Sequence, residues 1–248
     1  MKKILLSLAI ALLTALPAQA ADLTVSAAAS LTDAFNAVKA EFTKTHPGVN
    51  VTMNFAASGA LLSQMEKGAP VDVFASADQK TMDMAVEKKL IDAPTRVNFA
   101  QNSLTLTVPA ANPAKIKDLA SLKGASVKRV AIGNPDSVPV GRYTKAALTK
   151  MGEWDALAPK FVMAESVRQV LDYLARGEVD AGFVYGTDAK QGGDKVKVVA
   201  EIPLEKPVSY PIAVLSASAD KKNAAAFVAF VVSPEGQAIL AKYGFKKP

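Results

Sequence analysis

Hydrophobic residues recur along this 248-residue chain with two alternating periods. In residues 31–42 an apolar side chain returns every three or four positions, which predicts a helix with one buried face. In residues 49–55 apolar and polar residues alternate, which predicts a strand. The polar segment 45–48, with Pro47 and Gly48, separates the two and predicts the turn between them.

The alternation of strand and helix continues over the rest of the chain. Further strands are predicted at 71–75, 129–133, 161–164 and 179–185, and further helices from 58, after a cap at Asp78, at 140–151 and at 166–176. Two closing helices are predicted to begin at Ser218 and Ser233. This order of elements is typical of α/β layers built on parallel strands.

Two extended runs, at 102–108 and 210–215, interrupt the alternation. We interpret them as two crossings between two α/β lobes. Residues 21–101 together with 209–248 then form one lobe, and residues 102–208 form the other. Two such crossings make a hinge, so we expect the ligand site in the cleft between the lobes.

The first twenty residues have the pattern of a secretory signal. Lys2 and Lys3 precede an apolar run at 4–16, and the small-residue segment 17–20 ends in a cleavage pattern. The run is short for a membrane-spanning helix. We therefore expect cleavage near Ala20, a mature chain without membrane insertion, and a location in the periplasm.

Charge and cysteine content narrow the function classes. Loss of Lys2 and Lys3 lowers the formal net charge from +6 to about +4. The remaining cations are scattered and have no interleaved aromatic residues, which argues against nucleic-acid binding. The chain has no cysteine, so disulfides, thiolate metal sites and cysteine nucleophiles are excluded.

Serines at the ends of two predicted strands suggest an anion site. Ser30 and Ser58 each lie at the start of a predicted helix. The first N–H groups of a helix have no intrahelical acceptor and lie at the positive end of its dipole, so they favour an anion. Serine is also a common helix cap, and Ser30 with Asp33 predicts a capping box. Either serine alone would be interpreted as a cap.

Four segments in this chain resemble the periplasmic molybdate-binding proteins of molybdate ABC importers. They are 27–31 (AAASL), 68–78 (GAPVDVFASAD), 133–141 (GNPDSVPVG) and 184–189 (VYGTDA). The resemblance covers essentially the whole mature chain. It implies a two-lobed type II binding protein without a cofactor, acting as a monomer that delivers its ligand to an inner-membrane permease driven by a cytoplasmic ATPase.

The resemblance also implies the ligand and its site. In that family a tetrahedral oxyanion is held between the lobes by serines, backbone N–H groups and one tyrosine, with no charged side chain in contact. Carried over by motif, the ligand-binding residues are Ser30, Ser58, Val140, Val167 and Tyr185, and the ligand is molybdate, with tungstate bound comparably.

The residue types at these positions fit the implied role. A serine that accepts a hydrogen bond from its own helix can still donate its proton outward. Val140 and Val167 offer first-turn N–H groups, and Tyr185 ends a strand from which a phenol can point into a cleft. The five residues together supply about seven donors and no acceptor.

A cleft with donors alone discriminates among oxyanions. Molybdate, tungstate and sulfate are fully deprotonated near neutral pH, whereas phosphate keeps a proton that needs an acceptor. Burying that hydroxyl unpaired costs about 1 to 3 kcal/mol. Sulfate can be separated from molybdate only by cavity size, so a receptor for sulfate or an organic anion remains the main alternative.

The chain is poorly equipped as an enzyme. Its single histidine, His46, lies in a His-Pro-Gly turn, and the sequence has no Gly-x-Ser-x-Gly elbow. Ser218 begins a Ser-x-x-Lys match without partner motifs, and it predicts a helix cap. We therefore expect no enzymatic activity, and a secreted hydrolase is the less favoured alternative.

Overall fold

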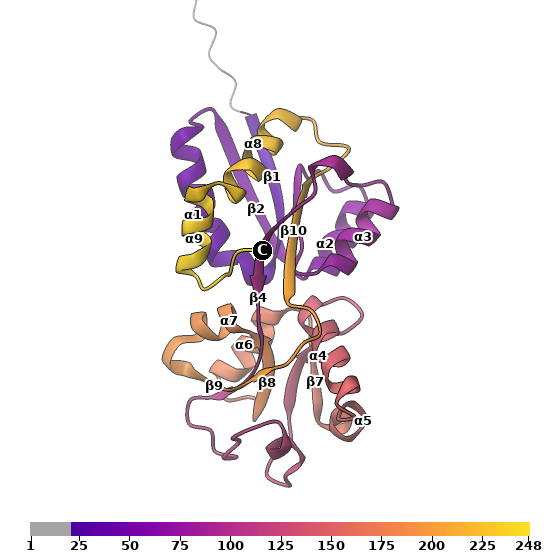
Figure 1. Ribbon diagram of the computed structural model, residues 1–248, viewed down its shortest axis with the longest axis vertical. Helices are drawn as coiled ribbons and strands as arrows, with labels where there is room; N and C mark the ends of the chain where they lie inside the picture. Colours follow the sequence, from indigo (N-terminus) through magenta and orange to yellow (C-terminus); the bar gives the residue numbers. More distant parts are fainter. Residues whose placement is uncertain (1–20) are drawn as a thin grey trace, which may run out of the picture.

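The computed structural model describes residues 21–248, so the predicted signal at 1–20 and its cleavage site lie outside the described residues. Two five-stranded sheets, each flanked by helices, follow one another along the long axis of the molecule (Figure 1). We call them the first lobe, which contains β1, and the second lobe, which contains β5.

The first lobe is built on one mixed sheet. Its strands, in spatial order, are β2 (Val49–Ala56), β1 (Ala21–Ala28), β3 (Val73–Ala75), β10 (Val208–Val214) and β4 (Val97–Asn102). β1 is parallel to β2 and β3, whereas β10 is antiparallel to β3 and β4. The helices of this lobe are α1 (Thr32–Thr45), α8 (Lys221–Val232) and α9 (Pro234–Lys242) in one group, and α2 (Ser58–Glu66) and α3 (Gln79–Glu87) in another (Figure 1).

The second lobe repeats this plan. Its strands, in spatial order, are β7 (Phe161–Ala164), β6 (Val130–Gly133), β8 (Ala181–Tyr185), β5 (Leu104–Pro109) and β9 (Val196–Ile202). β6 is parallel to β7 and β8, and β5 is antiparallel to β8 and β9. Its helices are α4 (Pro139–Lys150), α5 (Trp154–Leu157), α6 (Val167–Ala175) and α7 (Gly186–Gly192).

Two chain crossings join the lobes, as predicted. β4 continues into β5 through Ser103, and β9 continues into β10 through residues 203–207 (Figure 1). The two-lobed α/β class is thereby confirmed, but the expectation of parallel strands holds only in part. β5 and β10 enter their sheets from the cleft, so they run against the parallel strands that end there.

The division of the chain into 21–101 with 209–248 and 102–208 stays a prediction. The sheets show which strands pair, but pairing does not show which residues move as one unit. Because β1, β3, β6 and β8 all end at the cleft, the loops and helix starts that follow them face each other across it.

The predicted apolar face of α1 packs into the core. Its members and the preceding leucine are all at most 1% exposed: Leu31, Ala34, Phe35, Val38 and Phe42. The core continues across the cleft as a row of aromatic rings. Phe99 and Tyr210 have centroids 6.1 Å apart, and Tyr210 and Tyr185 are 6.0 Å apart. This row joins the first lobe to the second directly behind the cleft residues.

Three predicted helix caps are present. Asp78, Ser166 and Ser233 accept from the N–H groups of Thr81, Gln169 and Gly236, respectively. These side chains supply acceptors for first-turn donors that have no partner within the helix. The helices after them therefore begin within one residue of the predicted positions.

The predicted cap at Ser218 is wrong. α8 begins at Lys221, and its cap is Asp220, which accepts from the N–H of Asn223 at 3.0 Å. The Ser218 hydroxyl instead donates to Asp72 Oδ1 at 2.7 Å. The elements α5, α7 and β9, which are short or contain many charged residues, and residues 97–101 of β4 were not predicted from the sequence.

The C-terminal end of the chain is tied to the first crossing. The N–H of Gln101 in β4 donates to the carbonyl of Lys246 at 2.8 Å, and the N–H of Lys246 donates back to Gln101 at 3.0 Å. This pair forms an isolated antiparallel bridge between β4, at the edge of the first-lobe sheet, and the C-terminal segment. Residues 245–248 therefore lie against the hinge rather than at the far end of a lobe.

Within residues 21–248, no single helix has the length and hydropathy needed to cross a bilayer. α8 and α9 reach that threshold only when taken together, and their axes are bent by 60° at the junction. α8 buries Phe227 and Val231 completely in the protein core.

Candidate anion-binding site

A small cavity lies between the lobes, where the parallel strands end. It is lined by Ala28, Ala29, Ser30, Ala57, Ser58, Ala77, Val138, Pro139, Val140, Val167 and Tyr185. All five sequence-predicted residues are in this set, and none of the lining side chains carries a charge. The centre of a water-sized sphere can occupy about 10 Å³ of it, which is near the minimum for one enclosed water molecule. The cavity is therefore far too small for a sugar or a peptide.

Ser30 lies in a 3-10 turn, Ala29–Leu31, that precedes α1. Its side chain is buried, and its Oγ is 3.1 Å from the hydroxyl of Tyr210. The predicted capping box with Asp33 is wrong, because α1 is preceded by Leu31 and no side chain caps it. The extra turn lets the Ser30 hydroxyl face inward, and the Asp33 carboxylate lies 2.7 Å from Arg168 Nη1 instead.

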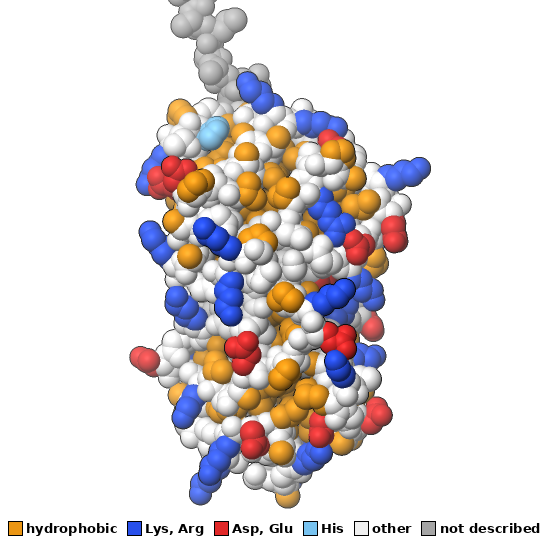
Figure 2. Space-filling model, viewed as in Figure 1, with side chains coloured by type: hydrophobic (Ala, Val, Ile, Leu, Met, Phe, Trp, Pro, Cys, Tyr) orange, Lys and Arg blue, Asp and Glu red, His pale blue; other side chains and the backbone are white. Residues whose placement is uncertain are grey.

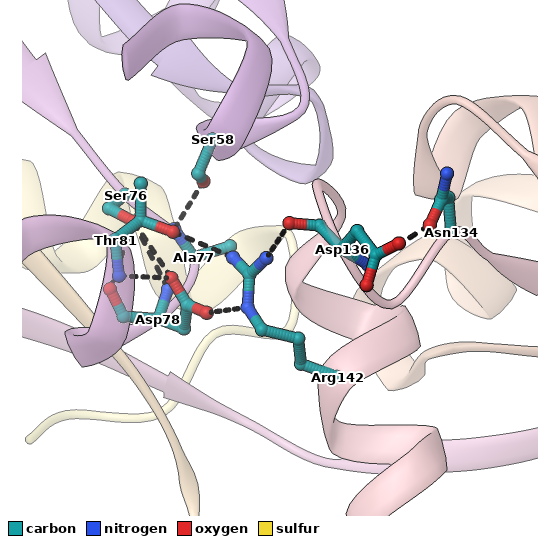
Figure 3. A network of polar contacts seen from close by, with 8 residues as sticks. All are labelled: Ser58, Ser76, Ala77, Asp78, Thr81, Asn134, Asp136 and Arg142. Carbon is teal, nitrogen blue, oxygen red and sulfur yellow. Dashed lines mark hydrogen bonds and ion pairs between the residues drawn. The ribbon is translucent and has the colours of Figure 1, made fainter. Parts of the chain in front are cut away.

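Ser58 is the first residue of α2, as predicted, and it is fully buried. Its Oγ accepts from the N–H of Ala77 at 3.0 Å (Figure 3). The expectation that it accepts from its own helix is wrong, since Ala77 in the loop after β3 supplies the donor. The hydroxyl proton of Ser58 remains free for an acceptor in the cavity.

Val140 and Val167 lie in the first turns of α4 and α6. Among the described residues neither backbone N–H has a backbone acceptor, as expected for first-turn positions. The start of α4 is held close to the end of β6, where a Cβ at Gly141 would lie 1.9 Å from the carbonyl oxygen of Gly133. Glycine at 141 therefore permits the approach that places the Val140 N–H beside the cavity.

Tyr185 ends β8, and its hydroxyl has no hydrogen-bond partner among the described residues. Burial raises its pKa well above the usual range, and the neighbouring Tyr210 and Tyr143 add to the rise. The phenol therefore stays protonated. A buried donor without an acceptor costs about 1 to 3 kcal/mol, so the free protein gains by accepting an anion there.

Two arginines of the second lobe reach the first lobe outside the cavity. Arg142 donates through Nε to Asp78 Oδ2 at 2.7 Å and through Nη2 to Thr81 Oγ1 at 2.6 Å (Figure 3). Arg168 lies 2.7 Å from both Asp33 Oδ2 and Asp188 Oδ1. Each guanidinium is matched by a carboxylate, so neither presents an unpaired charge to the cavity.

Asp188 is fully buried behind Arg168, in the first turn of α7. Burial raises the pKa of Asp188 to about 6, although Arg168 acts to lower it. The nearest atoms of this pair are close, but the Arg168 Nε–H is not aligned for a hydrogen bond. The close charge of Arg168 only partly offsets the loss of water around the carboxylate.

Four residues at or near the cavity were not predicted as site residues from the sequence: Tyr210, Asn102, Arg142 and Arg168. Tyr210 and Asn102 lie in the two extended runs, whose pattern predicts crossings and no site residue. Arg142 and Arg168 lie two residues and one residue after the predicted donors Val140 and Val167. Because the two arginines lie so close to those donors in the sequence, they could have been expected near the cleft. Their partners in the first lobe, Asp78 and Asp33, are distant in sequence and could not.

Residues 21–248 contain no group of three or more His, Cys, Asp or Glu arranged to hold a metal ion. His46 stacks on Phe42 at the end of α1 opposite to Ser30, with centroids 4.0 Å apart. Charged side chains of both signs are scattered over the face seen in Figure 2, with no continuous basic patch. The cavity is thus the place where the predicted chemistry comes together.

Comparisons with known proteins agree with this geometry. A family model described as "Bacterial extracellular solute-binding protein" matches residues 23–246. The molybdate-binding protein ModA of Escherichia coli (strain K12) is 43% identical over 232 residues, covering 90% of this chain and 88% of that protein.

Two solved structures are also similar. The substrate-binding domain of a putative molybdenum ABC transporter from Clostridium difficile is 37% identical, with a TM-score of 0.70 and coverage of 92% of this chain and 99% of that one. The periplasmic molybdate-binding protein of Azotobacter vinelandii is 27% identical, with a TM-score of 0.80 and coverage of 91% and 99%. The chain therefore belongs to the bacterial extracellular solute-binding proteins and, within them, to the molybdate-binding proteins.

Proposed function

We propose that this protein binds molybdate, and tungstate comparably, in the cavity between its lobes and delivers it to an ABC importer. The observation that carries the proposal is the buried, unpartnered hydroxyl of Tyr185 in a small cavity with no charged lining. The relationship to molybdate-binding proteins supports the choice of ligand.

We assign the binding role to Ser30, Ser58, Val140, Val167 and Tyr185. The serine and tyrosine hydroxyls and the first-turn N–H groups are all donors, and they converge from both lobes. A fully deprotonated tetrahedral dianion can accept from all of them. The positive ends of α2, α4 and α6 add a favourable potential without a charged side chain.

Hydrogen phosphate is the anion that this arrangement disfavours. Its hydroxyl needs an acceptor, and the neutral donors of the cavity offer none while they are all engaged. Sulfate meets the same donors, so its exclusion depends on the fit of a smaller ion. A receptor for sulfate or an organic anion is therefore the alternative to test, and the small cavity argues against most organic anions.

The partner is an inner-membrane permease driven by a cytoplasmic ATPase, because a binding protein alone moves nothing across a membrane. We place the mature protein in the periplasm as a monomer without a cofactor, and we assign it no enzymatic activity. A permease that recognises the rims of both lobes at once distinguishes the closed, loaded form from the open one.

A thermal-shift panel tests the ligand. A ligand that binds only the native state raises the melting temperature by mass action. Molybdate and tungstate should give large shifts, sulfate a small one and phosphate none. Equal shifts with sulfate and molybdate would identify a general oxyanion receptor, and the absence of a shift with every oxyanion would refute the proposal.

A further inference from the structure

We infer that Tyr210 and Asn102 are positioning residues, which orient the Ser30 hydroxyl so that its proton is directed to the bound anion. The inference deepens the proposed function and rests on it. It concerns a row of hydrogen bonds that begins in the first crossing and ends at the cavity. Neither Tyr210 nor Asn102 lines the cavity itself.

The direction of the row is set at Asn102, whose side chain is buried at the end of β4. Its Oδ1 faces two backbone N–H groups, that of Ser103 at 3.0 Å and that of Thr187 at 3.4 Å. Backbone N–H groups can only donate, so they hold the amide oxygen on their side and fix the orientation of the amide. Nδ2 must then face the other way.

The Asn102 amide nitrogen therefore donates to two hydroxyls. One N–H points to Thr187 Oγ1 at 2.8 Å and the other to Tyr210 Oη at 3.2 Å. An amide nitrogen has no lone pair to accept with, so the Tyr210 oxygen is the acceptor in this bond. The single proton of Tyr210 is left for its other neighbour.

That neighbour is Ser30, whose Oγ is 3.1 Å from the Tyr210 hydroxyl. Tyr210 is fully buried, and burial raises its pKa well above the usual range, so it keeps its proton. Ser30 Oγ consequently accepts from Tyr210, and the proton of Ser30 is free to point into the cavity. The order of donation is Asn102 to Tyr210, Tyr210 to Ser30, and Ser30 to the ligand.

The Ser58 hydroxyl is also an acceptor from the protein, but its donor is a backbone N–H group. Its Oγ accepts from the N–H of Ala77 at 3.0 Å, so its proton is also left for the cavity (Figure 3). Both serines are thus engaged as acceptors from the protein before a ligand arrives. Each hydroxyl oxygen keeps one further lone pair, but its proton is the group directed to the cavity, so each serine meets the ligand as a donor. The row behind Ser30 therefore contributes to selectivity against a protonated oxyanion as well as to affinity.

The test begins with Tyr210→Phe, which keeps the ring that packs against Phe99 and Tyr185 and removes the hydroxyl. Ser30 can then turn its proton either way. We expect the calorimetric affinity for molybdate to fall about tenfold, the range for one hydrogen bond to a charged group. Hydrogen phosphate binds too weakly to shift the melting temperature, so its affinity is measured at pH 8 by competition against molybdate at high phosphate concentration. This affinity should fall less or rise, so the ratio of molybdate affinity to phosphate affinity decreases.

A double variant separates this role from general damage. In the Ser30→Ala background, Tyr210→Phe should cost no further molybdate affinity, because the effect passes through the Ser30 hydroxyl. Thr187→Val is the matched control. It removes the other hydroxyl bonded to Asn102 and should lower the melting temperature of the free protein while leaving the molybdate-to-phosphate ratio unchanged.

A second variant reverses the direction of donation in this row of hydrogen bonds. Asn102→Asp replaces the donor facing Tyr210 by an acceptor, so Tyr210 donates to residue 102 and Ser30 donates to Tyr210. The added negative charge weakens the binding of both dianions by a similar factor, so it cancels from the ratio of molybdate affinity to phosphate affinity. The reversed hydrogen bonds should lower this ratio further than Tyr210→Phe does. This variant decides the matter if Tyr210→Phe does not fold.

The positioning role of Tyr210 and Asn102 can fail while the proposed oxyanion binding stands. An unchanged ratio in the folded Tyr210→Phe variant, or equal losses of molybdate affinity with and without the Ser30 hydroxyl, would overturn the inference alone. Failure of the parent protein to bind any of the oxyanions would instead overturn the proposed function.

Discussion

Arg142 of the second lobe and Asp78 of the first form an ion pair across the cleft, with Nε and Oδ2 2.7 Å apart. Their side chains are 16% and 6% exposed. Asp78 also caps α3 through Thr81, whose hydroxyl accepts from Arg142 Nη2 (Figure 3). Since the two charges belong to different lobes, opening the cleft separates them. The pair is therefore a contact of the closed form.

Arg142→Gln should weaken molybdate binding by about 1 to 3 kcal/mol, mainly through faster dissociation, because the closed form loses a largely buried pair. Asp78→Asn should act in the same direction while still capping α3, since asparagine is a good cap. Stopped-flow release rates and X-ray scattering with and without ligand measure the two effects. Release rates and compaction equal to those of the parent would show that the pair does not hold the lobes together.

Ser30→Ala, Ser58→Ala and Tyr185→Phe should each weaken molybdate binding by about 1 to 3 kcal/mol, because each removes a hydrogen bond to a charged ligand. Val140→Ala is the control, since it keeps the backbone N–H and should cost far less. Calorimetry on the folded variants measures the differences. Parent-like affinity in all three hydroxyl variants would exclude the proposed site.

Asp188→Asn should change the pH dependence of stability. The pKa of Asp188 is raised from 3.8 to about 6 in the folded protein, so the folded state binds the extra proton between these values. The free energy of unfolding therefore falls by up to about 3 kcal/mol as pH rises from about 4 to about 6. Above pH 6 this group adds no further change. Denaturant melts at several pH values should show this decline in the parent and not in the variant. Identical curves would contradict the burial argument.

Gly141→Ala should destabilise the protein by about 1 to 3 kcal/mol or more, because the added Cβ would meet a backbone carbonyl and must displace the start of α4. Gly48→Ala is the matched control, since a Cβ at 48 has no heavy atom within 4 Å. Denaturant unfolding compares the two variants. Molybdate affinity of the folded Gly141→Ala protein should fall too, because the Val140 N–H moves with α4.

Membrane vesicles with the permease and its ATPase test delivery. The liganded protein should stimulate ATP hydrolysis more strongly than the free protein, since the closed form presents both lobe rims together. Arg142→Gln should stimulate less at equal occupancy by ligand. Equal stimulation by free and liganded protein would count against closure as the signal.

The periodicity of apolar residues was sufficient to predict most of the fold. The buried face of α1 and the caps at Asp78 and Ser166 depend on residues close in sequence, and the strand at 161–164 could be predicted from its own short apolar run. β9 and α7 were missed because their pairing and burial depend on partners that lie far away along the chain.

The candidate site was predicted in part. Five of the residues that line the cavity were named from motifs, and the structure brings them together. What could not be predicted was how their protons are arranged. Ser30 meets Tyr210, 180 positions away, and Ser58 meets Ala77, 19 positions away. No local pattern predicts these contacts, and the expected capping bonds were the wrong ones.

The backbone bridge between Gln101 and Lys246 has a practical consequence for experiments on this protein. An affinity tag, fluorophore or surface tether added after Pro248 would emerge beside the hinge, where it can obstruct the bending that it is meant to report. The loop between α8 and β10 or the exposed end of α1 offers attachment points remote from that bend. Proteins prepared for single-molecule or immobilised assays should therefore carry their attachment groups there and leave the carboxyl end native.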